Sequence, residues 1–202
     1  MRRFRGSTGG RTRRAGVVLV ALALAVVGCT EDPNPRDQSS SPPGKAMKFA
    51  LGATDYNTTL DVPTEPAEVV KTNTPGIEFE LYALQRSDNV VSIIFALHNT
   101  GDSKLDLNGP SEDLAENTGA AASRYADNVG LIDTEGLKEY KVFEADDQCL
   151  CTATYATIDR EDIGPDERHY HVVQVAAPPA DVTKVTVMAG TMASVHDATI
   201  TG

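Results

Sequence analysis

The chain has 202 residues and a formal net charge of −11, with 29 acidic residues against 18 basic ones. Aromatic residues make up 5% of the chain, and tryptophan is absent. An acidic chain repels the phosphate backbone, so nucleic acid is excluded as a natural partner.

The chain opens with a basic leader that is typical of an exported protein. Its basic residues are Arg2, Arg3, Arg5, Arg11, Arg13 and Arg14, and no acidic residue occurs before the apolar run that follows. The apolar residues 17–27 follow, and as a helix they would span about 16 Å, far less than the ~30 Å hydrocarbon core of a bilayer. The pattern therefore predicts the hydrophobic region of a signal peptide. Arg13-Arg14 also fits a twin-arginine signal, so the export route stays open.

Two cleavage sites fit the end of this apolar run. Ala23-Leu24-Ala25 has the small-x-small pattern of ordinary signal peptidase, although cutting there would leave a short hydrophobic region. Val26-Val27-Gly28-Cys29 resembles the lipobox of bacterial lipoproteins, because a small residue precedes a cysteine where the apolar run stops. That resemblance implies removal of residues 1–28 and a diacylglyceryl thioether on Cys29. Two acyl chains suffice for stable anchoring at the extracytoplasmic face of the cell membrane.

Residues 29–47 predict a disordered tether that begins at the lipidated Cys29. They are rich in Pro, Ser and charged residues without periodicity, and their reach is up to about 50 Å. Removing the leader takes six of the 18 basic residues and no acid, which leaves twelve basic residues against 29 acidic ones, a net charge of −17. That charge opposes adhesion to an anionic membrane, so the acyl chains are the expected membrane contact.

Residues 48–202 predict one folded domain made of β-strands. Residues 77–84 alternate strictly, with Glu78, Glu80 and Tyr82 opposite an apolar face, as in a half-buried strand. Residues 90–97 are apolar at nearly every position, which indicates a central strand. Further strands are expected at residues 104–107, 129–133, 137–143, 149–158, 169–177, 182–188 and 194–200. Residues 108–128 predict a long loop with one helical turn at 111–116, and loops of this length are often functional.

Seven to nine short strands separated by turn residues favour an all-β fold, an antiparallel β-sandwich of immunoglobulin-like type. The core Trp of antibody domains is absent, and the two domain cysteines are too close in sequence for their inter-sheet disulfide. The motifs that carry a family resemblance are residues 98–102, residues 130–133 with Tyr140, Cys149-Leu150-Cys151 and residues 177–185. They resemble the immunoglobulin-like domain of exported actinobacterial lipoproteins. A similar domain precedes the peptidoglycan-binding module of some secreted proteins, but no such module is expected here.

Two short motifs in the domain carry possible chemistry. Cys149 and Cys151 remain once Cys29 is lipidated, and an oxidising compartment favours a disulfide between them over two reduced thiols. On a regular strand their Cα atoms would be ~6.5 Å apart, so the bond requires a bend or a bulge. His169 and His171 share one face of a predicted strand. If that strand lay beside Cys149 and Cys151, thiolates and imidazoles would form a ligand set for zinc or copper(I); otherwise both histidines lie hydrated near a strand end.

The sequence contains no nucleophile elbow, His-Glu-x-x-His motif, phosphate loop or dinucleotide fingerprint, so no catalytic residue and no cofactor are expected. The sequence therefore predicts a lipid-anchored, non-enzymatic binding or interaction module at the cell envelope. The loop at residues 108–128 is its expected surface for a protein or other envelope partner. The alternative is an extracytoplasmic metal-binding protein that uses Cys149, Cys151, His169 and His171.

Overall fold

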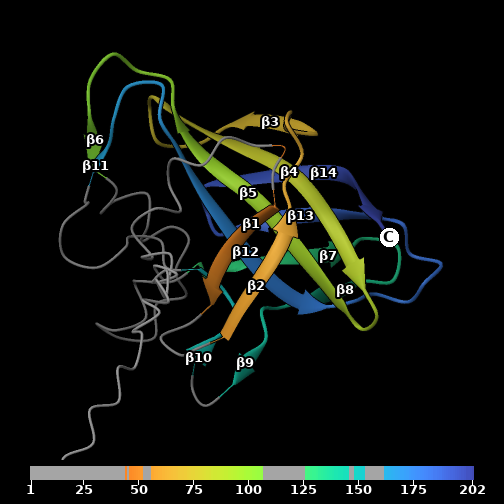
Figure 1. The fold of residues 1–202 in the computed structure, drawn as a ribbon. Helices are drawn as coiled ribbons and strands as arrows, with labels where there is room; N and C mark the ends of the chain where they lie inside the picture. Colours follow the sequence, from red (N-terminus) through yellow and green to blue (C-terminus); the bar gives the residue numbers. More distant parts are fainter. Residues whose placement is uncertain (1–43, 45, 52–55, 107–125, 146–147, 153–161) are drawn as a thin grey trace, which may run out of the picture. The chain divides into compact units, whose positions relative to one another are not determined.

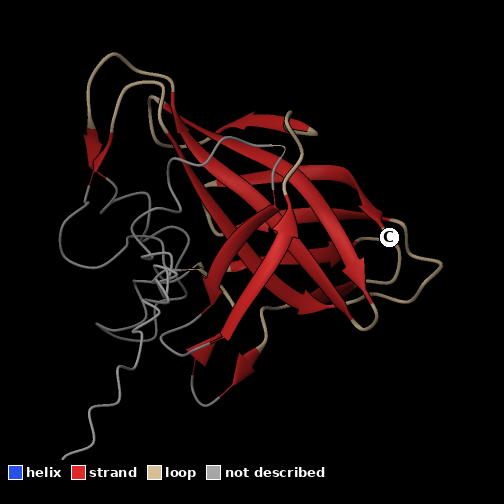
Figure 2. Cartoon of the chain, viewed as in Figure 1, coloured by secondary structure: helices blue, strands red, loops and turns tan. Residues whose placement is uncertain are grey.

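The computed structural model describes residue 44 and residues 46–51, 56–106, 126–145, 148–152 and 162–202 (Figure 1). None of these residues lies in a helix, so the all-β prediction is confirmed for the described part of the chain (Figure 2). Nor does this part contain a helix that could cross a membrane. The strands are β1 (Ala46–Leu51), β2 (Tyr56–Asp61), β3 (Glu68–Lys71), β4 (Ile77–Ser87), β5 (Val90–Asn99), β6 (Leu105–Asp106), β7 (Val129–Asp133), β8 (Lys138–Tyr140), β9 (Glu144–Ala145), β10 (Gln148–Cys149), β11 (Asp162–Ile163), β12 (Arg168–Ala176), β13 (Lys184–Ala189) and β14 (Ala193–Thr201).

Seven strands form one strongly curled sheet, a half-barrel, in the order β12-β5-β4-β14-β13-β7-β8 (Figure 1). An eighth strand of the same sheet, β3, pairs antiparallel with β4. The last residues of β14 run parallel to β4, with Ile200 opposite Leu84 and Thr201 opposite Gln85. The sequence predicted an antiparallel sandwich, and the antiparallel part of that prediction is wrong for this pair. The alternation of buried and exposed residues is the same in a parallel and an antiparallel strand, so the pattern does not distinguish them.

The inside of the half-barrel holds the larger hydrophobic core. Phe79 of β4 and Phe95 of β5 stack there, with their ring centroids 4.8 Å apart. The two strands form a hairpin whose turn includes Asp88 at a φ of 51°, a left-handed conformation that Asp tolerates better than most residues. This turn joins the strands predicted at residues 77–84 and 90–97.

A second hydrophobic core lies on the outer face of β4, β5 and β12, where the β1–β2 hairpin covers it. The hairpin is a separate two-stranded sheet with no ladder to the half-barrel. Its contribution to the shared cluster includes Met47, Phe49 and Leu51, and the cluster also contains Tyr82, Ile94, Ala96, Tyr170 and Val172. Because both faces of β5 are covered, nine of its ten residues are buried.

Most predicted strands occur close to their expected positions. The bounds of β7 match, and β5, β12, β13 and β14 differ from prediction by a few residues. No strand was predicted before residue 77, but the structure has three there, β1, β2 and β3. β1 begins at Ala46, two residues before the expected start of the folded domain at residue 48.

Two of the expected segments lie largely outside the described residues. These are most of the strand expected at residues 149–158 and most of the loop at residues 108–128. The strands that border these gaps, β6 and β11, pair antiparallel, with Asp106 opposite Asp162 and Leu105 opposite Ile163. The chain therefore leaves β6 and enters β11 at neighbouring positions.

Candidate functional site

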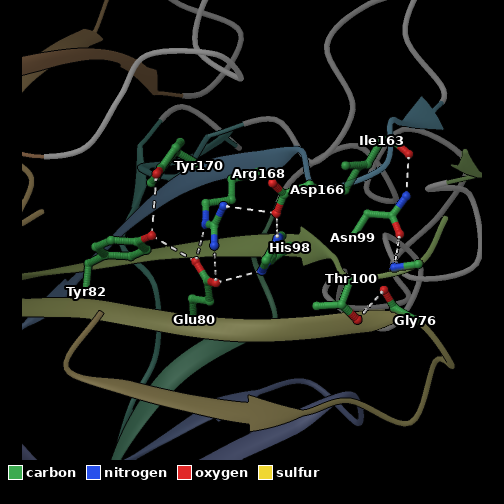
Figure 3. Close-up of polar contacts among 11 residues, drawn as sticks. Gly76, Glu80, Tyr82, His98, Asn99, Thr100, Ile163, Asp166, Arg168 and Tyr170 are labelled. Atoms are coloured by element: carbon green, nitrogen blue, oxygen red, sulfur yellow. Dashed lines mark hydrogen bonds and ion pairs between the residues drawn. The ribbon is translucent and has the colours of Figure 1, made fainter. Parts of the chain in front are cut away.

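A buried carboxylate, Glu80 of β4, is the centre of a polar network that links β4, β5 and β12 (Figure 3). Its side chain faces outward from the half-barrel, and the residue is 3% exposed. Arg168 of β12 donates two hydrogen bonds to it, from Nε to Oε2 at 2.9 Å and from Nη2 to Oε1 at 3.1 Å. Burial lowers the pKa of Arg168, but the hydrogen bonds to Glu80 and the attraction of the Glu80 charge together outweigh burial, so the net pKa of Arg168 is raised. This fork geometry is the strongest form of arginine–carboxylate pairing.

Two tyrosines extend the network toward the hairpin-covered core. The hydroxyl of Tyr82 donates to Oε2 of Glu80 at 2.8 Å and lies 3.4 Å from the hydroxyl of Tyr170 (Figure 3). Burial, the Tyr170 hydrogen bond and the nearby Glu80 carboxylate all raise the pKa of Tyr82. Burial is also the main cause of the raised pKa of Tyr170. Both phenols are therefore neutral donors at any ordinary pH.

His98 of β5 joins the buried carboxylate to the surface. Its Nδ1 lies 2.8 Å from Oε1 of Glu80, an ion-pair contact without hydrogen-bond geometry, and its Nε2 donates to Oδ1 of Asp166 at 2.9 Å (Figure 3). Asp166 is exposed and adopts a φ of 56° in the turn before β12. The hydrogen bond from His98, followed by the attraction of the His98 and Arg168 charges, lowers the pKa of Asp166.

The neighbouring side chain Asn99 ties together the loops at the same end of the sheet. It is fully buried, and its Nδ2 donates to the backbone oxygens of Ser103 at 2.8 Å and Ile163 at 2.9 Å. Its Oδ1 accepts a hydrogen bond from the backbone N–H of Gly101 at 2.9 Å. β5 ends at Asn99, and the Asn99 side chain joins the residues that follow β5 to the segment that enters β12.

The network around Glu80 links the three strands β4, β5 and β12. The carboxylate of Glu80 accepts two hydrogen bonds from Arg168 and one from Tyr82, and Nδ1 of His98 is a fourth close contact. The alternating pattern of residues 77–84 predicted a solvent-facing side for Glu80 and Tyr82, so this network was not predicted from the sequence.

The predicted cysteine pair is brought together. Cys149 and Cys151 have their sulfur atoms at disulfide distance and their Cα atoms 5.2 Å apart, closer than on a regular strand. The bend expected from the sequence is therefore present. Both residues lie in the inner core, where they are 6% and 0% exposed.

The two predicted histidines share the inner face of β12. Nδ1 of His169 lies 3.0 Å from Nε2 of His171, and Nδ1 of His171 lies 3.3 Å from the hydroxyl oxygen of Thr152. Burial, and then repulsion from His169, hold the pKa of His171 well below its usual range. This buried imidazole is therefore neutral. The alternative expectation, that both histidines lie hydrated near a strand end, is wrong for His171.

The strand adjacency that the metal hypothesis required is present, but the register does not favour it. Cys151 forms a bridge with Val173 of β12, not with a histidine. Among the described residues, no group of three or more His, Cys, Asp and Glu side chains is placed to hold a metal ion. The hypothesis of a metal site therefore gains no support from the geometry of Cys149, Cys151, His169 and His171.

A groove of about 500 Å³ lies at the β7–β8 turn and the segment that enters β13. Its charged lining residues are Asp133, Glu135, Asp181, Lys184 and Asp197. Oδ1 of Asp133 accepts hydrogen bonds from the backbone N–H groups of Glu135 and Gly136, at 3.1 and 2.8 Å, so this carboxylate stabilises the turn. The groove contains no residue of the Glu80 network.

Comparisons of the chain with protein-family models, with curated proteins and with solved structures find no match. The predicted lipidation site, Cys29, lies outside the described residues.

Replacing Glu80 by Gln is expected to lower the free energy of unfolding by about 2–3 kcal/mol. The loss is smaller than the ~3–5 kcal/mol of a fully buried broken pair, because the Arg168 side chain is 33% exposed. Urea unfolding measures it, and the matched control is Glu139→Gln on exposed β8, which is expected to change stability by less than about 0.5 kcal/mol. Equal effects of the two substitutions would contradict the structural role of Glu80.

The depressed pKa of His171 predicts a loss of stability on mild acidification. Its neutral form stabilises the fold above the unfolded-state pKa of ~6.5, and below that pH the unfolded chain binds a proton that the folded chain does not. Between about pH 6.5 and pH 5.5 the free energy of unfolding should fall by up to ~1.4 kcal/mol because of this residue. Urea titrations of His171→Gln should show a flatter dependence, whereas the exposed control His196→Gln should keep the wild-type slope. An unchanged slope in His171→Gln contradicts the prediction.

Proposed function

We propose that this protein is a lipid-anchored module held at the extracytoplasmic face of a bacterial cell membrane. The observation that carries the proposal is the basic leader followed by the apolar run that ends in Gly28-Cys29. A diacylglyceryl group on Cys29 would anchor the mature chain, and residues 30–43 would link it to the folded domain. At ~3.1 Å per residue such a Pro-rich segment reaches roughly 40 Å. The domain would thus stand clear of the lipid headgroups.

The proposed role is binding without catalysis. The residue types that serve most often as general acids and bases are histidine and the carboxylic acids. Among the described residues, Glu80 is occupied by four contacts, and the neutral, buried His171 faces Thr152 and His169. Glu80 and His171 would therefore stabilise the fold. A rigid β-scaffold of this kind can hold loops in position for a binding partner.

We further propose that the domain is related to the immunoglobulin-like sandwiches of exported lipoproteins. The resemblance in the motifs at residues 98–102 and 177–185 motivates this proposal. The arrangement of β3, β4, β5 and β12 across the inner core from β14, β13, β7 and β8 is compatible with two facing layers. The two layers would join where β14 pairs with β4.

Lipidation is tested by the mass and location of the natively purified protein. The wild-type chain is expected to begin at Cys29, to carry a diacylglyceryl group there and to sediment with membranes. Cys29→Ser should lose the lipid and leave the membrane fraction, because a single hydroxyl side chain cannot form the thioether. The control Cys149→Ser should keep both the lipid and the membrane location. A wild-type N-terminus at any other residue, or an unmodified Cys29, contradicts the proposal.

The partner surface is proposed to lie in the loop at residues 108–128. The pairing of β6 with β11, and the hydrogen bond from the backbone N–H of Ala126 to the oxygen of Thr152, hold the two ends of this loop on the domain.

Replacing residues 110–123 by a Gly-Ser linker is expected to abolish cross-linked adducts with envelope components in intact cells. The free energy of unfolding should stay within about 1 kcal/mol of wild type, since lengthening or changing a surface loop costs little. The control replaces Thr134 and Glu135 of the β7–β8 turn by Gly-Ser, and it should keep the adducts. Retention of every adduct in the loop variant would rule out this surface.

A further inference from the structure

In the described part of the chain, residues 142–143 and 150–152 cover one edge of β12. Along its other edge β12 pairs with β5 over its whole length. On the covered edge, Val172 and Gln174 each pair both of their backbone groups with this segment. The oxygen of Val172 accepts from the N–H of Thr152 at 2.9 Å, and the N–H of Val172 donates to Oγ1 of Thr152 at 3.0 Å. The N–H of Gln174 donates to the oxygen of Leu150 at 2.9 Å, and its oxygen accepts from the N–H of Phe143 at 2.9 Å.

The covering segment is the base of the small β9–β10 hairpin. Its two arms meet where the N–H of Leu150 donates to the oxygen of Phe143 at 2.7 Å. Leu150 therefore joins the other arm of the hairpin to β12: its N–H donates to the oxygen of Phe143, and its oxygen accepts from the N–H of Gln174. The direction of these two groups depends on the backbone bend at this residue.

Cys149 and Cys151 lie on either side of this bend. Their Cα atoms are 5.2 Å apart, and their sulfur atoms are at disulfide distance. A loop closed over two residues adds little chain-entropy stabilisation, so the main effect of the bond is to fix local geometry. Two unbonded sulfur atoms in contact need about twice the separation of a disulfide bond. Since both residues lie in the close-packed inner core, reduction forces the Cys149–Cys151 backbone toward the longer Cα separation of a regular strand.

We propose that the Cys149–Cys151 pair is a redox-operated latch that covers the edge of β12 when oxidised and uncovers Val172 and Gln174 when reduced.

The chemistry of release is thiol–disulfide exchange with a dithiol reductant. A reductant thiolate attacks the sulfur of Cys149, the more exposed residue at 6%, and the sulfur of Cys151 leaves as a thiolate that takes up a proton. The second reductant thiolate then attacks the mixed disulfide and displaces Cys149 as a thiolate, which is protonated in turn. The protein gains two electrons and two protons, and the reductant becomes a disulfide.

Amide hydrogen exchange tests the latch on the full-length, natively purified protein, with dithiothreitol as the reductant. Intact mass establishes that the pair is bonded before treatment and has gained two hydrogen atoms after it. On reduction, the amides of Val172 and Gln174 are expected to exchange at least tenfold faster, whereas amides of β13 between β14 and β7 keep their rates. Free thiols in the native protein, unchanged rates at Gln174 after reduction, or a uniform rise at all strands would each overturn the proposal.

Two variants separate the latch from a general loss of structure. The double variant Cys149→Ala/Cys151→Ala should show the fast exchange of the reduced protein and no response to dithiothreitol. Thr152→Val removes the acceptor of the Val172 amide and the hydroxyl beside His171, but it leaves the Leu150 oxygen that accepts from Gln174. It should therefore speed exchange at Val172 while Gln174 stays slow in the oxidised state. Slow exchange at Gln174 in the double variant, or a change at Gln174 in Thr152→Val as large as that at Val172, would contradict the role assigned to the pair.

Discussion

Strand β5 is packed on both faces, and this constraint organises the rest of the described structure. The curled sheet buries its inner face around Phe95, and the β1–β2 hairpin helps to bury its outer face around Ile94 and Ala96. Hydrophobic burial is proportional to the apolar area removed from water, so a strand covered twice contributes about twice as much as a half-exposed one. The β1–β2 hairpin makes no ladder with the half-barrel, and its attachment depends on this packing.

Covering the outer face also buries polar groups that must then be paired. Glu80 lies at the end of the outer face, and a carboxylate in that position would be costly without partners. The fork of Arg168 and the hydroxyl of Tyr82 supply them, while His98 connects the same carboxylate to Asp166 on the surface. Because this geometry needs β4, β5 and β12 in one register, the network favours a single alignment of the three strands. It thus adds specificity to a core whose apolar contacts are less directional.

The edge of β12 that does not pair with β5 shows how backbone groups at the side of the sheet are paired. There the backbone N–H and C=O groups of Val172 and Gln174 are all hydrogen-bonded to residues 143, 150 and 152. A few residues around Leu150 are enough, provided that their backbone is bent. The buried cysteines flanking Leu150 and the buried Thr152 therefore belong to the closure of the half-barrel as much as to its core.

The sequence by itself determined the strand content, most strand positions and the inner face of β12, because alternating burial is a local property that each segment carries in its own residues. The proximity of Cys149 and Cys151 was also predictable, since they are two residues apart. The tertiary structure alone decided that β1 and β2 cover the outer face, that β14 reaches β4 in parallel, and that Arg168 meets Glu80 from 88 residues away. A two-residue period separates an apolar face from a polar one, but it does not show which distant segment covers either face. The sequence therefore predicted a solvent-facing side for Glu80 and Tyr82, and the tertiary structure buries both.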